Sequence, residues 1–373
     1  MSDPVVNADP VVNADPVVDA DLVDLARLRN WMDEQGLGSG ELGALERLVG
    51  GTQNILLRFE RTGRTYVLRR PPRHLRKNSN ETMRREARVL AALADTAVPH
   101  PPLIAACPDT DVLGAAFYLM EPVDGFNPTR GLPELHRSDG GVRRAMGLSM
   151  VDAIAELGAV DYQAVGLADF GKPEGYLERQ VERWRSQLAG YSELDGYPGA
   201  EIPAVDDVAG WLEANRPALW SPGILHGDFH LANVMFEQDS ARLAAIVDWE
   251  LCTIGDPLLD LGWLLATWPD ERGGGRGSVG VQPWEGFPNG DELIEHYRGQ
   301  TNRDLSAIEW YAVLACYKLG IILEGTHARA CAGKADVNIG NALHATTLGL
   351  FERALGWIRR SGAGVGAGPP ARG

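Results

Sequence analysis

The sequence predicts an α+β protein with two unequal lobes: a small β-rich lobe with one main helix, and a larger, mainly helical lobe. In the first third, strand-like runs alternate with glycine-containing turns. In the remainder, apolar residues recur at helical spacing over several long segments. A chain of 373 residues is long enough to bury a core in each lobe.

The β-rich lobe is predicted from a hairpin and the helix that follows it. Residues 55–60 and 65–69 are strand-like and flank a turn at 61–64. A helix is expected from near Ser79, because Met83, Ala87 and Leu90 recur on one face. A further strand is expected at 117–120, and a short helix at 22–35.

The larger lobe is predicted to be helical around one small strand region. The clearest helical stretches are residues 142–160, 176–189, 205–214 and 305–323. Between the last two of these stretches, residues 224–225, 234–236 and 243–247 resemble short strands. We therefore expect a hairpin of polar residues inside a helical lobe.

Domain limits follow from changes in composition. Residues 1–21 contain three copies of the six-residue unit Asp-Pro-Val-Val-Asn-Ala, the third with Asp19 in place of Asn, and are expected to form a disordered tail. Residues 361–373 are rich in glycine and are expected to be a second disordered tail. Between them we expect a nucleotide-binding lobe at 22–120 and a catalytic and acceptor lobe at 121–360.

Composition narrows the possible partners and the compartment. The formal net charge of −16 argues against nucleic acid or an anionic membrane as the main partner. The four cysteines have no CxxC spacing, which fits a reducing compartment. Because no secretory signal is visible and the apolar run 258–268 is too short to cross a bilayer, a cytoplasmic protein is expected. The oligomeric state is not predicted.

The densest chemical signal is the run His226-Gly227-Asp228-Phe229-His230-Leu231-Ala232-Asn233. Fifteen residues after Asn233 come Asp248, Trp249 and Glu250. Phosphoryl transfer requires a carboxylate that orients the acceptor hydroxyl and oxygen ligands that hold Mg²⁺ against the phosphates. Two aspartates and an asparagine with this spacing supply that set of groups.

These two motifs resemble those of the aminoglycoside phosphotransferase family, which has a protein-kinase-like fold. Residues 248–261, from Asp248-Trp249-Glu250 through Gly255-Asp256-Pro257 to Leu261, are more similar still to the kinase-like domains sometimes fused to acyl-CoA dehydrogenases. The resemblance covers nearly the whole chain between the two tails. It implies a bilobal kinase-like protein that uses ATP and Mg²⁺.

The resemblance also implies a role for each matching residue. Asp228 would be the catalytic base or hydroxyl-orienting group, and Asn233 and Asp248 would be magnesium ligands. His226 and Asp260 would support the catalytic loop. Arg69 would contact phosphate where kinases have a lysine, with Glu86 as its acidic partner. The phosphate-covering loop would comprise Gly50, Gly51, Thr52 and Asn54, and the backbone at Glu121 and Val123 would meet the nucleotide base.

The expected function is therefore phosphoryl transfer from ATP to a hydroxyl of a small molecule, with GTP as the undecided alternative donor. A hydroxyacyl-CoA-type metabolite is favoured slightly over an aminoglycoside-type antibiotic as the acceptor. The basic stretch 69–88 would attract an anionic acceptor or is simply a solvated helix face. Two interpretations are open for three polar residues of a late helix, Glu324, His327 and Arg329. They would either face the acceptor pocket or serve as surface and packing residues.

Two other classes of function remain open at this stage. His226, Asp228 and His230 alternate along the chain and could be three metal ligands of a hydrolase. Alternatively, the protein could be an inactive nucleotide-binding scaffold. The presence of Asp228, Asn233 and Asp248 together argues against the scaffold.

Overall fold

The computed structural model describes residues 23–48 and 54–362. The chain forms two compact units, the first made of residues 1–125 together with Ala244–Cys252, and the second of Phe126–Leu243 and Thr253–Gly373. Residues 1–22 and 363–373, which hold nearly all of the two expected tails, lie outside the described residues. The predicted α+β class is confirmed by the succession of strands and helices.

The first unit contains an antiparallel five-stranded sheet with the order β1-β2-β3-β5-β4. The predicted hairpin is confirmed: β2 pairs with β3 from Ile55 opposite Arg70 to Arg61 opposite Arg64. Thr62 and Gly63, between the strands, have φ values of 51° and 76°, as a tight hairpin turn requires. The strands are β1 (Glu46–Arg47), β2 (Ile55–Arg61), β3 (Arg64–Arg70), β4 (Leu103–Cys107) and β5 (Phe117–Met120).

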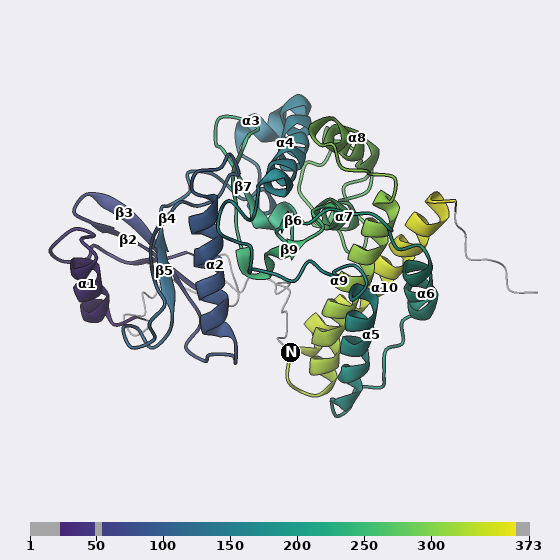
Figure 1. Ribbon diagram of the computed structural model, residues 1–373, viewed down its shortest axis with the longest axis horizontal. Coiled ribbons are helices and arrows are strands. Elements are labelled where there is room, and N and C mark those ends of the chain that lie inside the picture. Colours follow the sequence, from purple (N-terminus) through teal and green to yellow (C-terminus); the bar gives the residue numbers. More distant parts are fainter. Residues whose placement is uncertain (1–22, 49–53, 363–373) are drawn as a thin grey trace, which may run out of the picture. The chain divides into compact units, whose positions relative to one another are not determined.

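Two helices complete the first unit. The helix α1 (Leu25–Glu34) starts at Asp24, whose carboxylate accepts a hydrogen bond from the Arg27 N–H at 3.0 Å. Its buried face reaches the sheet through Trp31, whose ring lies 4.8 Å from that of Phe117. The helix α2 (Ser79–Leu93) packs against β4 and β5 (Figure 1). The helix predicted to start near Ser79 is thus confirmed.

The second unit is mainly helical, as predicted. The expected helix at 205–214 matches α6, and the one at 305–323 is the first part of a longer helix, α9. α5 begins four residues later than expected, because residues 174–179 form turns. The helices are α3 (Glu134–Ser138), α4 (Gly140–Ala159), α5 (Gln180–Gly190), α6 (Val205–Ala214), α7 (Leu258–Thr267), α8 (Gly290–Gln300), α9 (Ile308–Cys331) and α10 (Val337–Arg360).

The helices α7, α8 and α10 were not among the predicted stretches. α8 does carry a readable signal, since Asn289 and Glu292 form a reciprocal capping box at its start. α10 begins at Asp336, which accepts hydrogen bonds from the N–H groups of Asn338 and Ile339. α7 is buried along its whole length, so it lacks the polar face that marks a surface helix.

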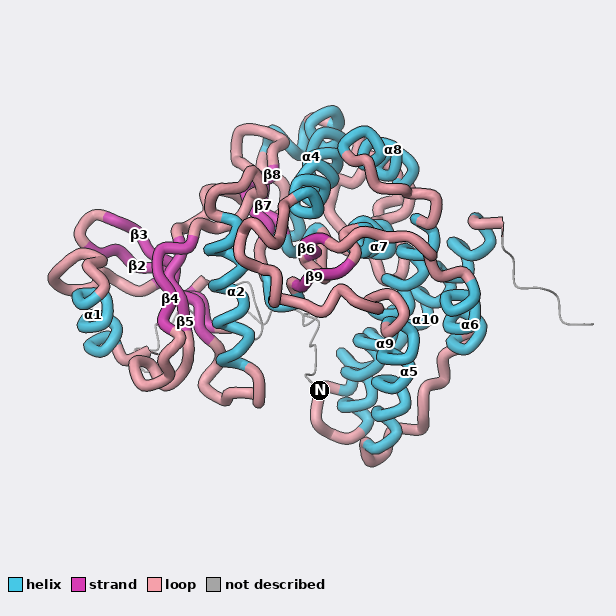
Figure 2. The backbone as a smooth tube through the Cα atoms, viewed as in Figure 1, coloured by secondary structure: helices cyan, strands magenta, loops and turns pink. Residues whose placement is uncertain are grey.

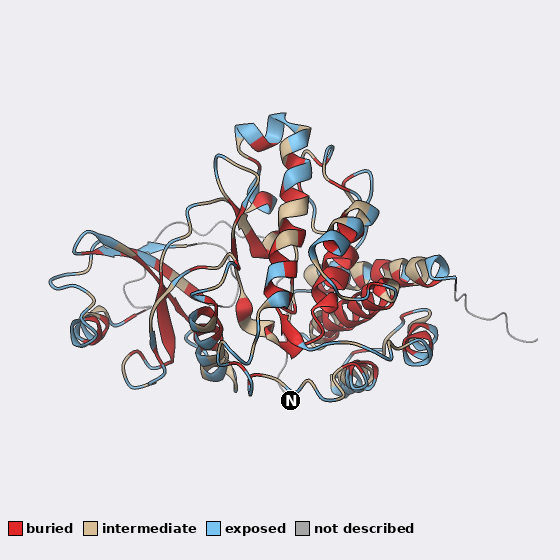
Figure 3. Cartoon of the chain, turned by 45° about the horizontal axis from the view of Figure 1, so that its top comes forward, coloured by how far each residue is buried: buried red, intermediate tan, exposed pale blue. Residues whose placement is uncertain are grey.

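The core of the second unit forms around α9. α9 and α10 run side by side (Figure 2), and α7 packs on α9 as well. Gly262 of α7 makes that approach possible, because a Cβ atom there would lie 2.6 Å from the backbone of Tyr311. Figure 3 shows how buried residues concentrate in the cores of the units. None of the described helices combines the length and apolarity needed to span a membrane.

Short strands position the polar motifs. β6 (Gly223–Leu225) pairs antiparallel with β9 (Thr253–Gly255) and ends directly before His226. β7 (Val234–Phe236) begins directly after Asn233 and leads to a turn closed by a 3.0 Å hydrogen bond from the Glu237 N–H to the Arg242 carbonyl. β8 (Leu243–Ile246) then carries the chain to Asp248.

Candidate active site

The loop between β6 and β7 holds Asp228 and Asn233 against each other. The amide nitrogen of Asn233 donates to Oδ2 of Asp228 at 2.9 Å and to the Asp228 carbonyl at 3.0 Å. Gly227 has a φ of 87°, a conformation that glycine adopts without strain. The five-residue spacing in the sequence thus becomes a direct side-chain contact.

Asp260, in the first turn of α7, fastens the start of this loop. Its two carboxylate oxygens accept the N–H groups of His226 and Gly227, at 2.6 and 2.8 Å. The carboxylate is fully buried, and this burial raises its pKa despite the nearby His226 and the two N–H donors. The loop is therefore anchored by paired charge-assisted hydrogen bonds.

The two histidines of the motif pack against the loop itself. His226 is buried, and its Nδ1 accepts the Asp228 N–H at 3.3 Å. His230 accepts the Ala232 N–H through Nδ1 at 3.1 Å and places Nε2 3.3 Å from Oδ1 of Asp228. Among the described residues, His226, Asp228 and His230 do not form a group of converging metal-ligand atoms. The hydrolase alternative therefore has no geometric support.

Lys318 of α9 joins this loop and was missed in the sequence. Its Nζ donates to the Gly227 carbonyl at 3.2 Å and lies 4.4 Å above the ring of Trp263. Burial lowers the pKa of Lys318 to about 8, although Asp228 and Asp260 favour its charged form. A single lysine in the otherwise apolar run 312–323 is the signal that could have revealed it.

The charge state of Asp228 depends on these neighbours. Burial by itself raises the pKa of its carboxyl, but His230, His226 and Lys318 outweigh that effect. The pKa of Asp228 is consequently below its ordinary value. The carboxylate is ionised at neutral pH and able to accept a hydrogen bond from a hydroxyl.

The first unit contains a separate buried ionic cluster. Arg69 of β3 places Nε 2.8 Å from Oε2 of Glu86 in α2 and a guanidinium nitrogen 2.7 Å from Oδ1 of Asp248. The Tyr118 hydroxyl donates to Glu86 at 2.9 Å, a contact not anticipated from the sequence. Burial raises the pKa of Glu86. Burial also disfavours the charged form of Arg69, but the nearby Glu86, Tyr118 and Asp248 outweigh this effect, so the pKa of Arg69 lies well above its ordinary value.

Asp248 has an uncommon backbone conformation. Its φ and ψ are 68° and 64°, in the left-handed region that only a few residue types other than glycine tolerate. Carboxylate oxygens of Glu86, Asp248 and Glu250 lie within 4.8 Å of one another. Oxygen donors of this kind suit Mg²⁺. Glu250 is a second residue that the sequence analysis did not single out as a ligand.

The residues predicted for the nucleotide are only partly described. Gly50, Gly51 and Thr52 lie outside the described residues, and Asn54 directly precedes β2. The side chain of Glu121 pairs with Arg64 at 2.7 Å, and its N–H donates to the Pro102 carbonyl at 2.9 Å. Val123 is partly buried in the segment that follows β5.

Together these features define a class of protein. An antiparallel sheet with a buried Arg69–Glu86 pair, followed by a helical unit with the Asp228–Asn233 loop, is the protein-kinase-like fold of small-molecule phosphotransferases. Residues 44–293 match the family described as "Phosphotransferase enzyme family", and the chain belongs to that family. The predicted resemblance, fold and enzyme class are confirmed.

Individual relatives agree with this assignment. A Ralstonia eutropha protein, provisionally named as an aminoglycoside phosphotransferase, is 30% identical with a TM-score of 0.74, covering 89% of this chain and 98% of its own. Acyl-CoA dehydrogenase family member 10 of Mus musculus is 30% identical over 90% of this chain and 31% of its own length. The GDP complex of aminoglycoside 2'-phosphotransferase-IIIa is 14% identical with a TM-score of 0.59, covering 87% of this chain and 98% of its own, and shows the shared fold.

The chain spans only about a third to two-fifths of the length of the first curated relatives, 31% for family member 10 and 40% for family member 11 of Gallus gallus. The matching region is therefore the kinase-like part of longer proteins.

Proposed function

We propose that this protein is an ATP- and Mg²⁺-dependent phosphotransferase that phosphorylates a hydroxyl group of a small molecule. The observation that carries the proposal is the ionised Asp228 with its Asn233 partner 2.9 Å away. Residues 22–120 would form the nucleotide-binding lobe, and residues 121–360 the catalytic and acceptor lobe. Asp248 would act with the nucleotide-binding lobe, because it contacts Arg69.

Asp228 would orient the acceptor hydroxyl and receive its proton as the oxygen attacks the γ-phosphorus. Asn233 uses its amide nitrogen on Asp228, which leaves its amide oxygen for a cation. Asp260 and Lys318 would hold the loop so that Asp228 needs little reorganisation during transfer. These groups position and stabilise charge, and no phospho-enzyme is required.

Mg²⁺ fits the donor groups present. Asn233 and Asp248 would be its protein ligands, and Glu86 and Glu250 add carboxylates beside Asp248. The ion would supply charge neutralisation of the transferred phosphoryl group. Arg69, braced by Glu86, would neutralise further phosphate charge.

For the nucleotide, the Glu121 N–H is already bonded to Pro102, so the Glu121 carbonyl and the backbone at Val123 would meet the base. Gly50, Gly51, Thr52 and Asn54 would cover the phosphates. A relative of the same fold is named as a GDP complex, which is why GTP belongs in any test of the donor.

The favoured acceptor is a hydroxyacyl-CoA-type metabolite. The curated relatives are named acyl-CoA dehydrogenase family members, which places a kinase-like region of this type in the same polypeptide as acyl-CoA chemistry. An aminoglycoside is the second candidate, because a neighbour is named as an aminoglycoside phosphotransferase and the net charge of −16 suits a cationic substrate.

The decisive experiment is a screen for the mass gain of one phosphoryl group on hydroxyacyl-CoAs and aminoglycosides, with ATP or GTP, and with Mg²⁺ or a chelator. We expect ATP- and Mg²⁺-dependent transfer to a hydroxyacyl-CoA. Asp228→Asn should lower the rate by about 10²–10⁴-fold. Asp152→Asn, which changes a partly exposed aspartate in the same unit, is the matched control. Equal rates for Asp228→Asn and wild type would refute the assignment of Asp228.

A further inference from the structure

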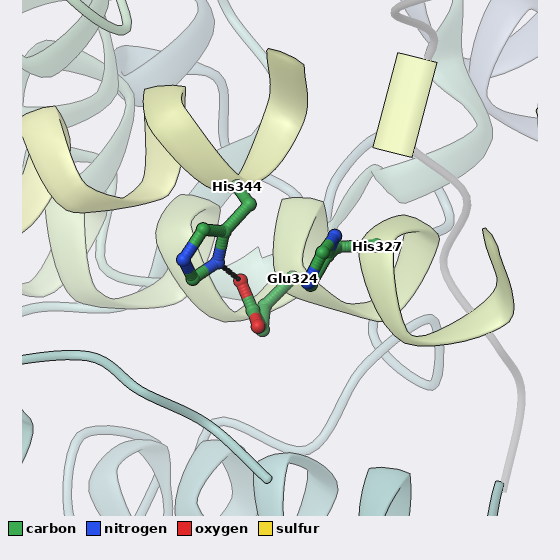
Figure 4. A group of neighbouring side chains, drawn as sticks. All are labelled: Glu324, His327 and His344. Carbon is green, nitrogen blue, oxygen red and sulfur yellow. Dashed lines mark hydrogen bonds and ion pairs between the residues drawn. The ribbon is translucent and has the colours of Figure 1, made fainter. Parts of the chain in front are cut away.

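A second cluster of polar side chains lies in the C-terminal part of α9, and the proposed phosphoryl transfer does not use its residues. Glu324, His327 and Cys331 are spaced by three and four residues, so they share one face of the helix. His344 reaches the same place from α10 (Figure 4). Carboxylate, imidazole and thiol are the groups with which proteins bind transition metals.

The distances within this cluster are those of converging ligands. Ligand atoms of Glu324, His327 and His344 all lie within 4.8 Å of one another. Oε2 of Glu324 lies 2.7 Å from Nδ1 of His344, and the two imidazole rings stack with centroids 4.6 Å apart. The Cys331 Sγ lies 3.7 Å from Nε2 of His327 and is not one of the converging atoms.

Burial makes this arrangement costly without a cation. The side chain of Glu324 is 0% exposed, and within residues 23–48 and 54–362 no lysine or arginine forms an ion pair with it. Its other oxygen accepts the Tyr197 hydroxyl at 2.7 Å, a neutral donor that brings no positive charge. A buried carboxylate needs a compensating positive charge or a proton.

His327 supplies an independent observation. Its Nδ1 is buried and has no hydrogen-bond partner among the described residues. A buried ring nitrogen without a partner is uncommon, because the loss of hydration is not compensated. His344 keeps 23% of its side chain exposed, which provides a route for an ion from solvent.

We propose that Glu324, His327 and His344 bind a divalent transition metal, for which Zn²⁺ has the matching chemistry, with water completing its coordination. Imidazole nitrogen donors select such ions over Mg²⁺, so this site is distinct from the oxygen-donor residues near Asp248. On binding, the proton on Nδ1 of His344 moves to Nε2, which leaves Nδ1 able to bind the ion. The bound ion links α9 to α10 across the turn that joins them.

The test is a titration with Zn²⁺ of the full-length protein from which metals have been removed by a chelator. Binding is measured by calorimetry and, independently, by competition with a chromophoric chelator. We expect one high-affinity ion per chain and a rise in the melting temperature on binding. Co²⁺ in place of Zn²⁺ should give visible d–d absorption bands, which His327→Ala removes and Cys331→Ser retains. Absence of stoichiometric binding would overturn the proposal and leave a hydrogen-bonded buried cluster in its place.

Variants distinguish this site from incidental binding elsewhere. His327→Ala and the near-isosteric Glu324→Gln should each abolish the high-affinity event, and Tyr197→Phe should weaken it on the order of 10-fold. His296→Ala removes a histidine that pairs with Asp152 in the same unit and should bind Zn²⁺ like wild type. Asp248→Asn should also retain the event. Loss of binding in Asp248→Asn but not in Glu324→Gln would place the ion near Asp248 and refute the assignment.

Discussion

The Nζ atom of Lys318 lies 3.2 Å from the carbonyl oxygen of Gly227, so a cation from the middle of α9 supports the loop that carries Asp228. The two residues are 91 positions apart in the chain. Asp260 binds the same loop from the other side of the peptide, through the N–H groups of His226 and Gly227. The N–H groups of His226 and Gly227 and the carbonyl of Gly227 are thus all hydrogen-bonded within the protein itself. These bonds hold the loop in place before any substrate binds.

Lys318→Met should change how stability depends on pH. The folded-state pKa of Lys318 is about 8 and its ordinary value is 10.5. Between these values the unfolded chain holds a proton that the folded chain has released, so the free energy of unfolding of wild type rises with pH relative to the variant. Over the whole interval between these two pKa values, the free energy of unfolding of wild type rises by about 3 kcal/mol relative to that of the variant. Urea denaturation of both proteins from pH 7 to 10 measures this difference, and parallel curves would contradict it.

Asp260→Asn should destabilise the protein although it changes few atoms. The N–H groups of His226 and Gly227 each donate to one carboxylate oxygen of the buried Asp260. In the variant, one of these N–H groups would face the amide nitrogen of asparagine and would lose its hydrogen-bond acceptor. We expect a loss of about 1–3 kcal/mol in the free energy of unfolding. Asp152→Asn, at a half-exposed pair with His296, serves as the control and should cost less than about 1 kcal/mol. Equal effects of the two substitutions would show that Asp260 does not anchor the loop.

A double-mutant cycle should separate the buried ion pair from a surface pair in the same unit. Arg69→Met leaves Glu86 and Asp248 buried without their cation and should cost about 3–5 kcal/mol. Combined with Glu86→Gln, the coupling energy should be roughly 1–3 kcal/mol. The control cycle uses Arg64 and Glu121, whose side chains are 49% and 46% exposed, and its coupling should stay below about 1 kcal/mol. Similar coupling in the two cycles would be the contrary result.

Gly262→Ala should weaken the contact between α7 and α9. The added methyl group would lie 2.6 Å from backbone atoms of Tyr311, so the helices must separate, at about 1–3 kcal/mol. Gly210→Ala is the matched control, because Gly210 lies in α6, is exposed and has nothing within 4 Å of the new Cβ. That control should stabilise the protein by about 0.5–1 kcal/mol through helix propensity. Thermal melting of both variants decides the matter, and a neutral Gly262→Ala would contradict the packing argument.

Much of the fold could be predicted from local patterns. The β2–β3 hairpin follows from two strand-like runs around Thr62-Gly63, and α2 from the spacing of Met83, Ala87 and Leu90. α7 and α10 were missed for a physical reason. α7 is buried on every side, so no polar face reveals its period, and α10 gains its stability from packing along α9.

The sequence by itself determined the class of chemistry, because Asp228 and Asn233 are near enough along the chain for a local turn to bring their side chains together. Tertiary structure decided what surrounds them. Lys318 and Asp260 reach the loop from two different helices, Tyr118 reaches Glu86 across 32 residues, and His344 meets Glu324 only because α10 returns along α9. Such contacts depend on how whole helices and strands pack, and no local pattern of residues encodes that packing.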